Sequence, residues 1–248
     1  MKERLDKLLL ERGLVSSRQQ AQALILQGEV LVNEQRVDKP GTRVESTLPI
    51  RIKNPPLRYV SRGGLKLEKA LDHFALEVSG WICLDLGAST GGFTDCLLQR
   101  GARRVFAVDV GHNQLDWKLR SNPQVTVIEG VNARYLTYGQ IGSSVDLITL
   151  DLSFISLTLV LPVLKSFLKE STTVLCLVKP QFEVGKGQVE KGGLVRDPAK
   201  HRQVLQSVQS FAVNLGYEVI GIVESPITGA EGNREFFLAL RPGSVLGQ

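Results

Sequence analysis

Two charged residues in this chain stand directly after apolar segments that are expected to be buried strands. Asp151 follows the run DLITL, and Lys179 follows VLCLV. A charge at such a position is costly unless it is solvated or used. Ligands of parallel α/β sheets bind outside the carboxyl ends of the strands. An acid and an amine at two adjacent strand ends therefore predict a catalytic site, where they could orient a reacting group or move its proton.

A glycine-rich turn follows an earlier strand of the same pattern. The segment LDLGASTGGFTD, residues 84–95, permits a sharp turn and the close approach of a nucleotide-like ligand. Its spacing departs from G-x-G-x-x-G and it lacks a G-K-[ST] ending, which argues against a pyrophosphate cradle and against a P-loop. Asp109 closes the next strand, where it can accept hydrogen bonds from both hydroxyls of a ribose. This combination is typical of S-adenosylmethionine sites, in which Asn132 could reach the adenine.

Apolar strands and helices alternate from residue 65 onward. Strands are expected at 82–86, 104–109, 125–129, 145–150, 173–178, 217–224 and 235–241, and helices at 65–76, 92–100, 156–169 and 198–215. Apolar strands separated by helices predict a parallel, doubly wound sheet. The last two strands have no helix between them and predict an antiparallel hairpin.

The first 60 residues follow a different pattern, with short helices before short strands. RLDKLLLERG predicts one helix, and Ser16 or Ser17 can cap a second one, SRQQAQALILQG. The alternation in EVLVNEQRV predicts a β-hairpin with its turn at Asn33-Glu34. The two prolines after Asn54 stiffen a linker, so we expect one domain at 1–57 and a second at 58–248.

The net charge of +5 is unevenly distributed. Residues 1–62 contain 12 Lys/Arg against 7 Asp/Glu, whereas residues 63–248 contain 18 of each. A basic patch on one small domain indicates a polyanionic partner. The pattern R-L-D-x-x-L, followed by S-R-x-x-A-x-x-L-I-x-x-G-x-V-x-V-N, resembles the S4 RNA-binding domain. The resemblance implies a small α+β module that lays its helices along the phosphates of structured RNA. We expect RNA contacts at Arg4, Lys7, Arg12 and Arg18.

A second resemblance rests on four residues within longer motifs. These are Lys66 in SRGGLKLEKAL, Asp151 in LDLSF, Lys179 in VKPQF and Glu235 in GNREFF. They resemble the catalytic K-D-K-E tetrad of the FtsJ-like ribose 2′-O-methyltransferases. The implied fold is an α/β, Rossmann-like class I methyltransferase with a seven-stranded, mostly parallel sheet. With the S4-like segment in front, nearly the entire chain resembles the TlyA family of ribosomal RNA methyltransferases, also named haemolysin A.

The resemblance also implies where the cofactor S-adenosylmethionine binds and what reaction follows. We expect its contacts at Asp85, Gly87, Ala88, Ser89, Gly91, Gly92, Phe93, Asp109, Asn132 and Asp151. The expected substrate is ribosomal RNA in a ribosomal subunit, methylated on the ribose of a cytidine. The chain is similar to the shorter family members, which modify 23S rRNA, and modification of 16S rRNA as well is the alternative.

In the implied reaction a neutral ribose hydroxyl is a poor nucleophile. Lys179 could accept or steer its proton, acting either as a base or only as an orienting group. Asp151 and Glu235 would hold the lysines in place and balance their charge. Since the methyl donor is already activated, in-line positioning would supply much of the acceleration.

Three other functions compete with this interpretation. A nicotinamide dehydrogenase would need the missing G-x-G-x-x-G. A noncatalytic RNA-binding protein would be favoured by loss of a tetrad residue, and all four are present. A pore-forming haemolysin would need residues 147–164 to span a bilayer, but Asp151 and Pro162 interrupt this apolar stretch.

The remaining features predict a reduced, cytoplasmic protein without a membrane partner or a metal. The amino-terminal segment is charged and amphipathic, and the three cysteines lack C-x-x-C spacing. The three histidines, His73, His112 and His201, are not spaced from acids or cysteines as metal ligands would be. The loop 181–198, rich in Gly and Lys, is compatible with a mobile surface loop and with an RNA-contacting lid.

Overall fold

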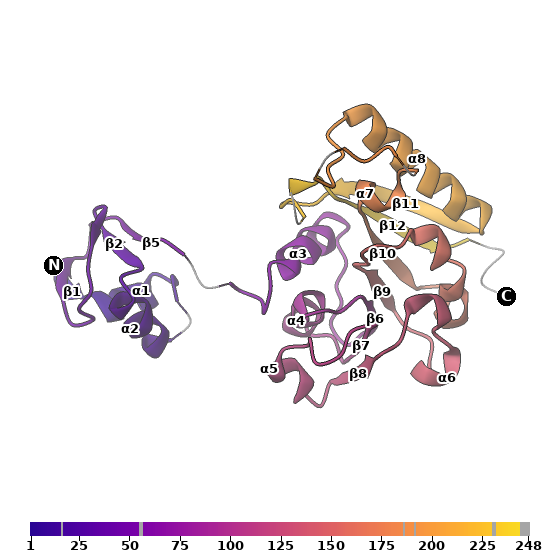
Figure 1. The fold of residues 1–248 in the computed structure, drawn as a ribbon. Helices are drawn as coiled ribbons and strands as arrows, with labels where there is room; N and C mark the ends of the chain where they lie inside the picture. The colour runs from indigo at the N-terminus through magenta and orange to yellow at the C-terminus, as the bar shows by residue number, and fades with distance from the viewer. Residues whose placement is uncertain (16, 55–56, 186, 191, 230–231, 244–248) are drawn as a thin grey trace. The chain divides into compact units, whose positions relative to one another are not determined.

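The chain consists of two compact units, Met1–Leu57 and Arg58–Gln248, each with its own apolar core (Figure 1). The computed structural model describes residues 1–15, 17–54, 57–185, 187–190, 192–229 and 232–243. Ser16, one of the two expected caps, and the linker residues Pro55 and Pro56 lie outside this part of the chain. The core of the first unit is built from residues between Leu5 and Ile52.

The first unit combines two helices with two small antiparallel sheets. Its elements are β1 (Lys2–Arg4), α1 (Leu5–Glu11), α2 (Arg18–Leu26), β2 (Val30–Val32), β3 (Gln35–Arg36), β4 (Arg43–Glu45) and β5 (Ile50–Ile52). β1 pairs with β4, and β2 lies between β3 and β5. Ser17 caps α2 by accepting a hydrogen bond from the Gln20 amide at 3.2 Å. Asn33 and Glu34 adopt φ values of 49° and 62°. These left-handed values suit a tight hairpin turn, which confirms the predicted turn.

The second unit contains a seven-stranded, mostly parallel sheet in the order β11-β12-β10-β9-β6-β7-β8. Its strands are β6 (Ile82–Leu86), β7 (Arg104–Asp109), β8 (Val125–Glu129), β9 (Leu147–Leu150), β10 (Thr173–Val178), β11 (Tyr217–Glu224) and β12 (Phe236–Pro242). β12 runs antiparallel to both β10 and β11, whereas the pairs among β8, β7, β6, β9 and β10 are parallel. The predicted sheet and its terminal hairpin are therefore confirmed.

Helical segments cover both faces of this sheet (Figure 1). The segments are α3 (Gly63–His73), α4 (Gly92–Gln99), α5 (Trp117–Arg120), η1 (Ala133–Tyr135), α6 (Tyr138–Ile141), η2 (Leu157–Leu159), η3 (Val163–Phe167), α7 (Pro180–Glu183) and α8 (Pro198–Asn214). Along β10, Val174 and Cys176 enter the core shared with α8, while Leu175 and Leu177 enter the core shared with α3 and α4. Burial on both faces explains why these strands are continuously apolar in sequence.

The α-helix expected over 156–169 is wrong. Two short 3₁₀ segments, η2 and η3, occupy this stretch. Pro162 lies between them, and in a continuous α-helix its ring would clash with the carbonyl four residues earlier. Consequently the apolar stretch 147–164 divides into β9 and these short turns. Among the described residues, no helix is long and apolar enough to cross a membrane.

Asp85 is a fully buried charge inside the central strand β6. Its carboxylate accepts hydrogen bonds from the Thr94 hydroxyl at 2.7 Å and from the Thr149 hydroxyl at 2.8 Å, which ties β6 to α4 and β9. Burial raises the pKa of Asp85 to about 6, against the two hydroxyl bonds that lower it. We expected a cofactor contact at this residue. The structure instead places Asp85 behind the glycine-rich turn, where it supports the turn and cannot touch a ligand.

Replacing Asp85 by asparagine should remove a pH dependence of stability. Native Asp85 binds a proton below about pH 6, whereas an unfolded aspartate does so only below about pH 4. As the pH rises through this window the native state alone loses a proton, so the parent should lose stability relative to Asp85→Asn. Urea unfolding of both proteins at about pH 4.5 and about pH 7 measures this effect. Between these two pH values the free energy of unfolding of the parent should fall, relative to that of Asp85→Asn, by on the order of 1–3 kcal/mol. Glu77→Gln, at an exposed carboxylate, is the control. An equal pH response in Asp85→Asn would contradict the assignment.

Candidate active site

The glycine-rich turn lies against the end of β9. Gly87 has φ +83°, and a Cβ at this position would lie 2.5 Å from the main-chain oxygen of Asp151. Only glycine allows this approach. The Asp109 carboxylate accepts hydrogen bonds from the Ser89 amide at 2.8 Å and from the Gly111 amide at 2.7 Å. Asp109 therefore fixes the turn relative to the end of β7.

A cavity of about 630 Å³, here called the turn cavity, opens between the turn and the ends of β7 and β8. Gly87, Ser89, Asp109, Asn132 and Asp151 line it. The Asn132 side-chain oxygen accepts a hydrogen bond from the Arg134 amide at 3.0 Å and so begins η1. The turn, the ribose-binding candidate and the adenine-binding candidate thus face one space.

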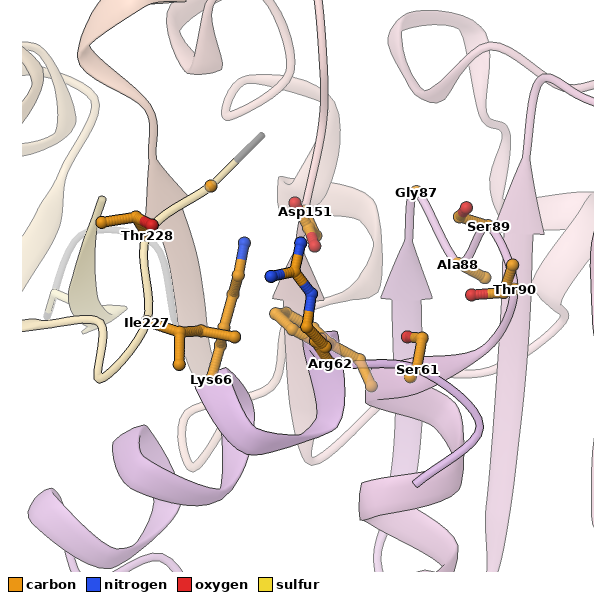
Figure 2. Close-up of a pocket in the computed structure, with 14 residues that line it drawn as sticks. Ser61, Arg62, Lys66, Gly87, Ala88, Ser89, Thr90, Asp151, Ile227 and Thr228 are labelled. Atoms are coloured by element: carbon orange, nitrogen blue, oxygen red, sulfur yellow. The ribbon is translucent and has the colours of Figure 1, made fainter. Parts of the chain in front are cut away.

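A second, smaller cavity of about 230 Å³, here called the α3 cavity, separates α3 from the turn (Figure 2). Arg62 and Lys66 extend into it from α3, toward Asp151. Ala88, Gly92 and Phe93 also line it. Gly91 lines none of these cavities; a Cβ there would meet the Leu119 side chain at 2.2 Å, so Gly91 shapes the turn.

The four tetrad residues all line a third cavity of about 540 Å³, here called the lysine cavity. Lys179 Nζ lies 2.6 Å from Asp151 Oδ1 and donates to the Ser153 hydroxyl at 3.0 Å. Lys66 Nζ lies 2.5 Å from Glu235 Oε2. The side chains of Lys66 and Glu235 are 11% and 2% exposed, which makes this a desolvated ion pair. Asp151 lines all three cavities and marks their junction.

The lysine cavity also contains residues that the sequence did not indicate. Ser153 and Phe154 follow Asp151, and Gln181 and Phe182 follow Lys179. Their proximity to two predicted site residues is the available signal. The backbone is irregular where these strands end, so the orientation of the side chains cannot be predicted from a periodic pattern.

The segment expected to be a loop at 181–198 begins inside the short helix α7 and returns to the site. Val189 and Gly193 line the lysine cavity. Asn233 donates to the Gly193 carbonyl at 2.8 Å and accepts from the Val195 amide at 2.9 Å, which anchors this segment beside Glu235. Lys186 and Lys191 lie outside the described residues.

The basic residues expected to bind RNA are engaged within the first unit. Asp6 is buried and lies 3.0 Å from the Arg4 guanidinium and 2.9 Å from that of Arg18. Hydrogen bonds, the one from Arg4 first, hold the pKa of Asp6 well below its usual range. Lys7 lies between Glu3 and Glu11, and Arg12 donates to the Leu48 carbonyl at 2.9 Å. These contacts fix the positions in which the cations are presented.

The unit boundary corrects the charge distribution inferred from the sequence. Residues 1–57 carry 10 Lys/Arg and 7 Asp/Glu, and residues 58–248 carry 20 and 18. The excess positive charge is therefore shared. Arg58 and Arg62, counted with the first domain above, belong to the second unit, where Arg62 lines the α3 cavity.

The doubly wound sheet, its glycine-rich turn and the acid that ends β7 are those of an α/β domain of the methyltransferase type. Comparison with known families agrees. Residues 59–242 match the model of the FtsJ-like methyltransferases, and residues 3–48 match the S4 domain. The chain belongs to the FtsJ-like methyltransferase family, and to the group of its members that carry an S4 domain and include TlyA.

Individual relatives are similar over nearly the whole chain. YqxC of Bacillus subtilis, which carries an rRNA methyltransferase name, is 52% identical over 98% of this chain and 87% of its own length. The 16S/23S rRNA (cytidine-2′-O)-methyltransferase TlyA of Mycobacterium tuberculosis is 49% identical over 96% and 89%. A solved structure from Streptococcus thermophilus, titled as a hemolysin, has a TM-score of 0.75 at 46% identity and covers 98% of this chain and 89% of that one.

The Lys66–Glu235 pair should behave as a coupled buried pair in unfolding experiments. Lys66→Met leaves the Glu235 carboxylate buried without its cation and should cost about 3–5 kcal/mol. The double variant Lys66→Met/Glu235→Leu removes both charges and should recover most of that loss. Lys69→Met, at an exposed lysine of the same helix, should change the free energy of unfolding by less than about 0.5 kcal/mol. Urea unfolding measures all of these; additive losses in the double variant would contradict the coupling.

Proposed function

We propose that this protein transfers the methyl group of S-adenosylmethionine to the ribose 2′-hydroxyl of a cytidine in ribosomal RNA. The observation that carries the proposal is the junction at Asp151, where the turn cavity and the lysine cavity meet. The family membership and the M. tuberculosis relative's name support the reaction and the substrate class.

We assign S-adenosylmethionine to the turn cavity because the residues there fit its nucleoside. A carboxylate has about four lone-pair sites, and Asp109 uses two of them for backbone amides, which leaves acceptors for two ribose hydroxyls. Gly87 lines this cavity and lets the turn lie directly against the main chain of Asp151. Asn132 is the candidate partner for the adenine. When bound, S-adenosylmethionine supplies an electrophilic methyl group on a sulfonium.

We assign the acceptor ribose to the lysine cavity, beside Lys179. The bond between the ribose oxygen and the methyl carbon forms as the carbon–sulfur bond breaks, and the hydroxyl proton must leave. An ammonium has three donors; Lys179 donates to the Ser153 hydroxyl and forms an ion pair with Asp151. A remaining donor can point to the hydroxyl oxygen, where it stabilises the charge that develops as the proton leaves. The group available to accept that proton and pass it to solvent is the Asp151 carboxylate, which lies beside Lys179.

Lys66 and Glu235 line the same cavity. Their ion pair joins α3 to the residue before β12 at the edge of the lysine cavity. We infer a positioning role for this pair, since each charge already satisfies the other. In-line geometry between the two cavities then supplies much of the rate enhancement.

The first unit is proposed to dock structured ribosomal RNA through Arg4, Lys7, Arg12 and Arg18. Its match to the S4 domain supports this role. Phosphate contacts of this kind position the substrate and carry no sequence information directly. Selection of the nucleotide therefore falls to the second unit.

The decisive test is Lys179→Ala assayed on purified 30S and 50S subunits, with the modified nucleotide mapped by mass spectrometry. Methylation should fall by roughly 10²–10⁴-fold while affinity for S-adenosylmethionine stays unchanged, as expected for a group that acts in the transition state. Lys179→Arg should also fail, because a planar guanidinium cannot reproduce the geometry of an ammonium.

Asp109→Ala is the matched control for this experiment. It should weaken cofactor binding in calorimetry by on the order of 2–4 kcal/mol. Near-normal turnover by Lys179→Ala would sink the tetrad mechanism. A parent protein that methylates neither subunit would sink the proposed function itself.

Removing the first unit should separate docking from cofactor binding. A protein of residues 58–248 keeps the core clusters of the second unit and should bind S-adenosylmethionine like the full chain. It should lose most of its rRNA affinity, and the remainder should depend less steeply on salt because fewer phosphates are neutralised. Filter binding across a salt series measures both quantities. Equal affinity and equal slope in the two proteins would show that the first unit does not dock the RNA.

A further inference from the structure

One wall of the lysine cavity has no role in the methyl-transfer chemistry described above. It consists of Phe154 in the loop after Asp151, and of Gln181 and Phe182 in the short helix α7 after Lys179. The rings of Phe154 and Phe182 face each other across it, with centroids 5.0 Å apart and planes inclined by 49°. Phe154 is 90% exposed and adopts φ +63°, a value that bulky side chains avoid. Such strain persists only where the surroundings impose it, and it is concentrated at functional sites.

The surroundings that impose this conformation are visible in the hydrogen bonds. At one end of the loop, Lys179 donates to the Ser153 hydroxyl at 3.0 Å. At the other end, Glu183 accepts from the Ser156 hydroxyl at 2.7 Å and from the Leu157 amide at 2.8 Å. Burial raises the pKa of Glu183. The loop is thus fastened to α7 on both sides of Phe154, and the aromatic wall is built as one piece with the Lys179 region.

Gln181 lies in this wall, two residues after Lys179, and lines the lysine cavity. Its side-chain oxygen is buried and has no hydrogen-bond partner within the described residues. A buried acceptor without a donor costs about 1–3 kcal/mol, so such groups in native proteins call for an explanation. A substrate that brings its own donor would remove this cost on binding.

We propose that Gln181 reads the base of the acceptor nucleotide, a pyrimidine that carries an exocyclic amine. This inference rests on the proposed function and extends it to the choice of nucleotide. The base must leave its stack for its ribose to reach the site, and enzymes that act on nucleotides hold such bases with aromatic rings and with hydrogen bonds to the Watson–Crick edge. On that edge cytosine offers an amine donor beside a ring-nitrogen acceptor, which the amide of Gln181 complements when its oxygen faces the amine. With its oxygen and nitrogen exchanged, the amide would complement uracil, so the preference requires the surrounding wall to hold one orientation.

The pairing accounts for selection by the second unit. A ribose hydroxyl is common to all four nucleotides, so the residues that handle the hydroxyl cannot choose among them. Gln181 and Lys179 line the same cavity, so the base that Gln181 would contact belongs to the ribose beside Lys179. Discrimination by one bidentate contact is roughly tenfold to a hundredfold.

The test compares the parent with Gln181→Ala and Gln181→Met on ribosomal subunits that carry either cytidine or uridine at the mapped target. The parent should prefer cytidine by roughly tenfold or more. Both variants should lose most of that preference, and methylate the cytidine substrate roughly tenfold to a hundredfold more slowly. Methionine fills nearly the same space as glutamine, so a loss shared by both variants reports the amide and not packing.

Gln206→Ala, on the exposed face of α8, is the matched control and should retain the preference. Calorimetry with S-adenosylmethionine should give one affinity for all four proteins, which shows that each variant is folded. A parent without preference for cytidine over uridine, or folded Gln181 variants that keep the parent's preference, would overturn this inference and leave the proposed methylation standing. Inactivity of the parent on every subunit would instead refute the proposed function.

Discussion

The site depends on the contact between the glycine-rich turn and the end of β9. A Cβ at Gly87 would lie 2.5 Å from the main-chain oxygen of Asp151, so the two segments approach with no side chain between them. Because of this approach, one residue, Asp151, borders the turn cavity, the α3 cavity and the lysine cavity together. If these segments were further apart, the turn cavity and the lysine cavity would not adjoin. The proposed methyl donor in one could then not be aligned with the ribose hydroxyl in the other.

Buried charge is the second requirement, and the fold handles it by pairing residues that are distant in sequence. Lys66 and Glu235 are 169 positions apart, and their pair connects the first helix of the unit to its last strand. Breaking such a pair is expensive because the remaining charge stays desolvated. The site therefore contributes to holding α3 against the sheet, while the α3–β12 contact keeps the cationic wall in place. Asp85 does the equivalent task behind the turn, where hydroxyl groups replace a cation.

The sequence predicted the parts of this architecture that follow periodic or end-of-strand rules. Buried strands are continuously apolar, so the sequence predicts how many there are, how they alternate with helices and where they end. Asp151 and Lys179 could be predicted because they follow two of those strand ends. The α-helix expected over 156–169 does not form, because Pro162 divides the segment into η2 and η3. Phe154 is not among the predicted site residues, and Gln181 is included only in the loop 181–198, because a strained φ and an unpartnered oxygen depend on tertiary structure. The charge assignment shifted for a simpler reason: Arg58 and Arg62 pack with the unit that follows them.

The redistribution of charge changes how the two units divide their work. If the whole excess were in the first unit, the second would hold RNA only through the reacting nucleotide. Arg62 instead lines the α3 cavity beside Lys66, so the second unit also presents positive charge next to the proposed site. The first unit would then bind structured RNA by its shape through Arg4 and Arg18, whose positions are fixed by ion pairs with Asp6. The second unit needs only local contacts to insert one nucleotide. In the proposed function, affinity for a large RNA and selection of a single base rest on different residues, so that a change in one would leave the other in place.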